Sequence, residues 1–114
     1  MEAAGILEVY GLATAFAAAD EGCKAGDVRL EIFDKNKPGK NADSLPVPVI
    51  IMIKFRGAVA DVEAAMAAAE TRAQELAGVV TKHVIARPTA DTEKMLKLSG
   101  LDKKKVNKVY LKEV

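Results

Sequence analysis

Two alanine-rich segments with helical spacing, each set between strand-like segments, constrain the fold of this chain more than any other feature. Residues 12–26 read LATAFAAADEGCKAG, and residues 57–78 read GAVADVEAAMAAAETRAQELAG. Apolar side chains three or four positions apart share one helical face, so both segments are predicted to be amphipathic helices ending at glycine. The predicted buried stripes are Leu12, Phe16, Ala19 and Cys23 in the first helix, and Val62, Met66, Ala69, Ala73 and Leu76 in the second.

Four further segments alternate apolar and polar residues or are rich in β-branched residues, as strands are. They are residues 3–11, 27–35, 47–55 and 79–88. A short helix is predicted after them, over residues 89–98, with Thr89 or Asp91 as its N-cap. The order β-α-β-β-α-β predicts an α+β, ferredoxin-like split βαβ fold, in which two helices cover one face of a four-stranded sheet.

The third predicted strand is apolar at consecutive positions, since residues 49–53 read VIIMI. Neighbouring side chains on a strand point to opposite faces, so this strand is expected to present apolar groups on both. One face packs under the helices, and the other needs a separate cover. Self-association would supply it. The alternative is that the terminal helix and the tail cover this face within one chain.

The length of 114 residues suits one domain, which we place at residues 1–98, followed by a basic extension at 99–114. Lys and Arg number 17 against 16 Asp and Glu, a balance that argues against a dedicated nucleic-acid binder. The extension is an exception, because residues 103–105 are all lysine. No leader and no apolar run long enough to cross a membrane is recognised, so a cytoplasmic location is expected.

No catalytic or metal-binding pattern emerges from the sequence. His83 is the single histidine and Cys23 the single cysteine, which excludes a histidine cluster and a Cys-x-x-Cys zinc site. The lysine-rich stretch 35–44 lacks the spacing of a phosphate-binding loop and precedes a strand rather than a helix. We therefore expect no enzyme activity, no cofactor and no metal.

Three stretches taken together resemble the bacterial microcompartment (BMC) domain of shell proteins. They are the segment EAAGILEVYGLATAFAAADEGCKAG, the helix start FRGAVADVEAAM and the strand end VTKHVIARP, which occur in the family's order over residues 2–96. The resemblance implies a structural protein that forms flat hexameric tiles of a shell, with a central pore for small metabolites. Its implied partners are neighbouring shell hexamers, other shell proteins and encapsulated enzymes, with no membrane or nucleic acid.

The loop between the second and third strands is the one that forms the pore in this family. Here it is about ten residues longer than usual and contains no cysteine that could hold an iron–sulfur cluster. Its charges repeated around a six-fold axis would favour anions. A gating or occluding collar, a binding surface and a disordered spacer all remain open as its role. The pore-loop residues are Asp34, Lys35, Asn36, Lys37, Pro38, Gly39, Lys40, Asn41, Asp43 and Ser44.

Two positions match the family's contacts between neighbouring hexamers. Lys24 corresponds to the lysine that lies along its symmetry mate at the seam, and Arg87 to the arginine that reaches across it. Long side chains can bury their stems along such an edge while their charged ends bind carbonyl oxygens. Without the resemblance, both would be interpreted as solvated surface charges.

A ferredoxin-like oligomeric binding module is the alternative function. A nucleic-acid-binding sheet requires aromatic side chains at alternating positions of its central strands, and the third strand has Val49, Ile51 and Ile53 there. A small-ligand site between subunits has no fingerprint in the sequence. The shell function accounts for the apolar strand, the alanine-rich helices and the long loop together.

Overall fold

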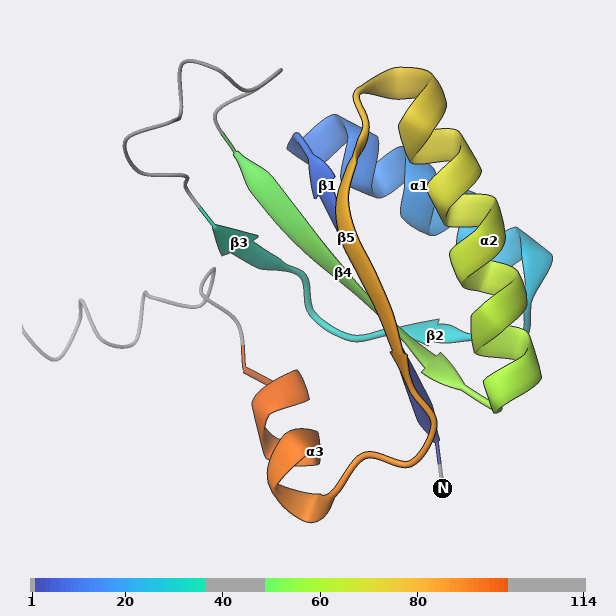
Figure 1. Cartoon of the computed structure of the whole chain (residues 1–114), viewed down its shortest axis with the longest axis vertical. Coiled ribbons are helices and arrows are strands. Elements are labelled where there is room, and N and C mark those ends of the chain that lie inside the picture. The colour runs from blue at the N-terminus through green and yellow to red at the C-terminus, as the bar shows by residue number, and fades with distance from the viewer. Residues whose placement is uncertain (1, 37–48, 99–114) are drawn as a thin grey trace, which may run out of the picture.

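The computed structural model describes residues 2–36 and 49–98, and its elements follow the predicted order (Figure 1). The strands are β1 (Ala3–Tyr10), β2 (Arg29–Leu30), β3 (Asp34–Asn36), β4 (Ile50–Gly57) and β5 (Val79–Ile85). The helices are α1 (Leu12–Ala25), α2 (Val59–Leu76) and α3 (Ala90–Leu96). The α+β class and the predicted helix pair are confirmed.

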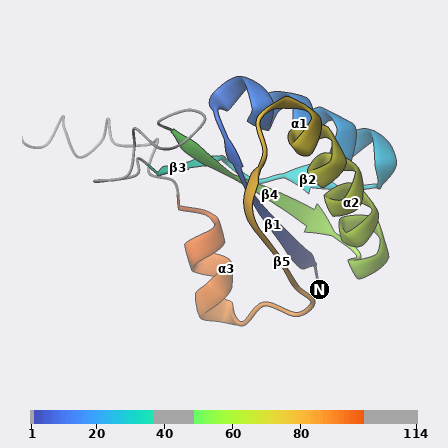
Figure 2. The same ribbon diagram turned by 45° about the horizontal axis from the view of Figure 1, so that its top comes forward.

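The sheet is antiparallel with the order β2-β4-β1-β5, and β3 also pairs with β4. Both long helices lie on one side of it and α3 lies on the other (Figures 1 and 2). We call these sides the helix face and the α3 face. The core lies on the helix face, where Leu7, Ile53 and Phe55 are fully buried against the small side chains of α1 and α2.

The predicted second strand, residues 27–35, is wrong as one continuous element, because it is broken into β2 and β3. Leu30 pairs with Phe55, and Asp34 pairs with Met52. Between these two pairs the edge segment advances by four residues, whereas β4 advances by only three. One extra residue is therefore inserted, as in a β-bulge, and the side-chain alternation shifts. The shift brings Phe33 to the helix face, where its ring lies 5.5 Å from that of Phe16.

The stripe predicted for α1 is also wrong in part. Leu12, Phe16 and Cys23 are exposed, whereas the buried residues are Thr14, Ala15, Ala18, Ala19 and Gly22. Small side chains let α1 approach both α2 and the sheet, so the closest packing selects the smallest residues rather than the most apolar ones. In α2 the predicted stripe is confirmed at Val62, Met66, Ala69 and Ala73, but Leu76 is exposed.

Gly22 marks the tightest point of this packing. A Cβ added there would lie 2.5 Å from Cζ of Phe55 and 3.1 Å from the carbonyl oxygen of Ala65. We expect Gly22→Ala to lower the free energy of unfolding by about 2 kcal/mol, because overpacking outweighs the roughly 1 kcal/mol gain in helix propensity. Urea titration measures this. Ala25→Ser, which also adds one heavy atom but on the exposed end of α1, should change stability little.

The expected apolar surface on the α3 face of β4 extends only as far as Met52. Ile50 is buried at one end, but Lys54 and Arg56 occupy the same face further along and are 2% and 1% exposed. The cover over them is α3, so of the two alternatives the terminal helix supplies at least part of it. The predicted N-cap Thr89 is confirmed, since its Oγ1 accepts a hydrogen bond from the Thr92 amide at 3.3 Å.

Candidate functional site

The strand residues that flank the predicted pore loop and the predicted hexamer-contact residues lie at opposite ends of the sheet. Tyr10 pairs with Ile50, and Asn36 pairs with the same Ile50, so the chain enters and leaves the loop at one end, which we call the loop end. Ala4 pairs with Ile85 at the other end, which we call the far end. The connections from α1 to β2 and from β5 to α3 are both at the far end.

Three of the predicted pore-loop residues form β3. Asp34, Lys35 and Asn36 pair with Met52, Ile51 and Ile50 of β4. The remaining residues, Lys37, Pro38, Gly39, Lys40, Asn41, Asp43 and Ser44, lie outside the described part of the chain. A pocket of about 240 Å³ adjoins β3 and is lined by Glu8, Asp34, Lys35, Asn36 and Met52. The described part of the loop therefore places charged groups of both signs at the loop end.

Lys24 and Arg87 are both exposed and both lie towards the far end. Lys24 is in the last turn of α1 and pairs with Asp20 at 2.7 Å, and its hydrogen bond to that carboxylate raises the pKa of the lysine. Arg87 lies in the bend between β5 and α3, before the buried Pro88. Within one chain neither side chain is buried, so both charged ends are available to a neighbour.

The β2/β3 edge of the sheet, together with the neighbouring face of α1, carries apolar side chains that are exposed or only half-buried among the described residues. Phe16 is 63% exposed although its ring contacts Phe33, and Leu12 lies one turn before it on the same face of α1. We call this surface the Phe16 patch. It comprises Leu12, Phe16, Leu30, Ile32 and Phe33.

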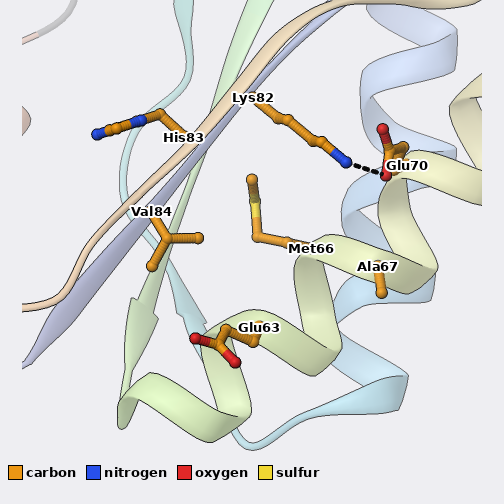
Figure 3. Close-up of a pocket in the computed structure, with 7 residues that line it drawn as sticks. All are labelled: Glu63, Met66, Ala67, Glu70, Lys82, His83 and Val84. Carbon is orange, nitrogen blue, oxygen red and sulfur yellow. Dashed lines mark hydrogen bonds and ion pairs between the residues drawn. The ribbon is translucent and has the colours of Figure 1, made fainter.

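A cleft lies at the opposite edge of the sheet, beside β5. It has a volume of about 370 Å³ and lies between α2 and β5, with Met66, Ala67 and Val84 among its lining residues (Figure 3). Glu63 lies towards one end, and at the other Lys82 Nζ donates a hydrogen bond to Glu70 Oε1 at 2.8 Å. His83 also lines this α2–β5 cleft, but its ring is turned away from it. In the described part of the chain, no strand pairs with the outer side of β5.

The two buried cations of β4 were missed by the sequence analysis. Arg56 Nε donates to the carbonyl oxygen of Ala3 at 3.2 Å, and its Nη2 donates to the carbonyl oxygen of Glu2 at 3.3 Å and to the Glu93 carboxylate of α3. Lys54 Nζ donates to the carbonyl oxygens of Leu96 and Leu98 at 3.0 and 2.7 Å. The sequence contains one signal for these buried cations. Lys54 and Arg56 are two residues apart, and so on the same face, in an otherwise apolar strand.

A network of ion pairs extends from Arg56 to the surface. Glu31 binds Arg56 at 3.3 Å and Arg29 at 3.2 Å, and Arg29 binds Glu2 at 2.7 Å. The hydrogen bond from Arg56 lowers the pKa of Glu93, and that from Arg29 lowers the pKa of Glu2. Burial lowers the pKa of Lys54, partly offset by the nearby Asp34 and Glu31 carboxylates.

These lowered carboxylate pKa values predict a loss of stability in acid. Glu2 and Glu93 have an ordinary pKa of 4.5, and a lower value in the folded state means that the unfolded state binds protons first. Their contribution is complete above about pH 4.5 and declines as the pH falls through the lowered folded values. Thermal midpoints between pH 3 and 7 measure this. Glu93→Gln should flatten the profile, and an unchanged profile would contradict the assignment.

The described residues contain no group of three or more His, Cys, Asp or Glu side chains that could hold a metal ion. Cys23 is exposed, and partial burial raises the pKa of its thiol, so it is not an activated nucleophile. Among the helices of the described segments, none is long and apolar enough to cross a membrane. The geometry thus presents surfaces suited to assembly rather than a reaction centre.

Comparison with known proteins identifies one family that this chain resembles. Residues 3–88 match the family described as BMC domain. The bacterial microcompartment shell protein PduA of Citrobacter freundii is 35% identical over 95 residues, which cover 83% of this chain and 91% of that protein. PduA of Salmonella typhimurium is also 35% identical over 95 residues, covering 83% and 90%.

A similar fold occurs in a crystal structure of a microcompartment protein from Desulfitobacterium hafniense. The TM-score is 0.64 with 25% sequence identity, over 85% of this chain. The present chain spans about half of that longer one, 47% of its length.

Proposed function

Because this chain belongs to the BMC domain family, we propose that it builds hexameric tiles whose central pore passes small metabolites, anions above all. The chain is a structural shell protein of a bacterial microcompartment and not an enzyme. Nothing in the described residues favours the alternative of a nucleic-acid or small-ligand module, and Lys54 and Arg56, the cations of the central strand β4, are buried rather than exposed.

The observation that best supports a hexameric ring is that the two edges of the sheet present different surfaces. The Phe16 patch projects at the β2/β3 edge, and the α2–β5 cleft is hollow at the β5 edge. A contact between two different surfaces of identical subunits repeats head to tail and closes into a ring when the rotation permits. Insertion of Phe16 against Met66 and Val84 of the next subunit would bury both apolar surfaces at once.

Ring closure through the two side edges would leave the loop end free to face the ring axis. The loop at residues 34–44 carries three lysines and two aspartates, so six copies would bring a charge of about +6 close to the axis. A concentrated positive field raises the local concentration of anions. This supports a preference for anionic metabolites.

The far end would then form the outer rim of the tile, where Lys24 and Arg87 meet neighbouring hexamers and other shell proteins. The BMC-like domain at residues 1–98 supplies these contacts. The extension at 99–114 carries five lysines and lies outside the described residues. We assign to this extension no role in forming the ring. Encapsulated enzymes are candidate partners of the assembled shell.

The proposal is tested by the mass of the full-length protein in solution. Light scattering should give about six times the 12.1 kDa chain, and electron microscopy at rising concentration should show sheets or tubes. A stable monomer or trimer at all concentrations would overturn the hexameric tile.

Lys24→Ala tests the outer rim separately from the ring. We expect this variant to keep the hexamer mass but to form no extended sheets, because the side chain that would cross the seam is gone. Lys94→Ala is the matched control, since Lys94 is also exposed and also pairs with an aspartate of its own helix, Asp91. Equal sheet formation by the two variants would place the seam elsewhere.

A further inference from the structure

We infer that α3 is a detachable cover on the α3 face of the sheet, held by the two cations of β4 rather than by an apolar core, and able to open while the body stays folded. This goes beyond the proposed shell function, and it concerns how the C-terminal extension is presented.

Apolar burial contributes little to the docking of α3. Leu96 is buried, but Met95 is 69% exposed and Leu98, two residues after the helix ends, is 66% exposed. By contrast, α2 buries five side chains, Val62, Ala65, Met66, Ala69 and Ala73, against the core. Segments with few buried apolar contacts open with a free energy below that of global unfolding.

Polar contacts instead hold both ends of α3. Arg56 binds Glu93 near the start of the helix, and Lys54 binds the carbonyl oxygens of Leu96 and Leu98 at its end. A cation at the end of a helix is favourable because the unpaired carbonyls there carry partial negative charge. Since the two cations are two residues apart on one strand, they fix the position and direction of α3 on the sheet.

Such a clamp specifies position more than it contributes stability. Buried ion pairs lose most of their Coulombic gain to desolvation, so a helix held mainly by them is positioned well but released readily. The body does not depend on α3 for its core, because the fourteen-residue cluster from Ala3 to Ala73 lies on the helix face. Opening of α3 therefore leaves that cluster intact.

Opening would change the reach of the C-terminal extension. With α3 docked, the chain is tied to Lys54 through the Leu98 carbonyl oxygen, and residues 99–114 start from there. With α3 released, the last residue fixed to the sheet is Ile85 of β5, so residues 86–98 would lengthen the connection between the sheet and the extension. Fully extended, they add up to roughly 40 Å. The five lysines of the extension could then contact anionic groups well beyond the tile that carries them.

Hydrogen exchange followed by mass spectrometry, on the assembled full-length protein, tests this inference. We expect amides of α3 to exchange at least tenfold faster than those of α2 in the natural sequence. Glu93→Gln should speed exchange in α3 about tenfold further, with α2 and β4 unchanged and the particle mass constant. Lys54→Met should act in the same direction from the other end of α3.

Glu75→Gln is the matched control, because it removes an exposed ion pair with Arg72 on the body, away from the α2–β5 cleft, and should leave exchange in α3 unchanged. Equal exchange rates in α3 and α2, rising together in Glu93→Gln, would show that α3 is part of one cooperative unit and overturn the inference. The proposed hexamer is judged by mass alone, so either result leaves that question separate.

Discussion

Phe16→Asp is expected to yield a folded monomer that no longer forms rings. Phe16 is 63% exposed in the single chain and lies outside the buried stripe of α1, so its replacement should leave the single chain able to fold, with a cooperative thermal transition. In the proposed ring it enters the α2–β5 cleft, where a carboxylate would be desolvated against Met66 and Val84 and near the Glu63 and Glu70 carboxylates. That cost is several kcal/mol per contact, which weakens each contact about a hundredfold or more.

Light scattering and thermal unfolding together measure this outcome. Met95→Asp is the matched control, because Met95 is similarly exposed (69%) but lies on α3, outside the proposed contact. The control should keep the mass of six chains. A Phe16→Asp variant that keeps this mass would show that the Phe16 patch does not form the subunit contact. Dissociation of both variants would attribute the effect to added charge instead.

Arg56→Ala is expected to lower the free energy of unfolding by about 3 kcal/mol, the size found when one partner of a buried ion pair is removed. Arg56 is 1% exposed and binds the carbonyl oxygens of Ala3 and Glu2 as well as two carboxylates. Truncation to alanine leaves those oxygens buried without a donor and opens a cavity in the α3 face.

Urea titration distinguishes this effect from a general loss of charge. Arg29→Ala removes the same charge from the same network, but the Arg29 side chain is 53% exposed. Exposed ion pairs contribute about 0–1 kcal/mol, so this control should be nearly neutral. Equal losses in the two variants would mean that burial of Arg56 does not determine its contribution.

The order of the elements was predictable because periodicity is a local property of the chain. The two helices, the strands that flank them and the Thr89 cap all follow from side-chain spacing within short windows. The predicted stripe of α2 held from Val62 to Ala73 for the same reason, since this helix packs its most apolar face against the sheet. The sequence also suggested the family before any coordinates, through motifs in a fixed order.

The errors arose where distant segments decide the outcome. In α1 the large residues Leu12 and Phe16 were expected inside, but the approach of α2 and Phe55 leaves room for alanine and glycine alone. The break between β2 and β3 depends on pairing with β4, which no local pattern reveals. The positions of Lys37 to Ser44 stay predictions, because they lie outside the described residues.

For this protein, the sequence by itself determined the α+β class, the order of helices and strands, and the membership that its motifs indicated, because each depends on neighbouring residues. The tertiary structure alone decided that Lys54 and Arg56 are buried under α3, and that Phe16 and the α2–β5 cleft occupy opposite edges. A lysine or arginine on a strand is normally solvated, and it becomes a buried anchor when acceptors from remote segments, here Glu93, Leu96 and Leu98, are brought to it.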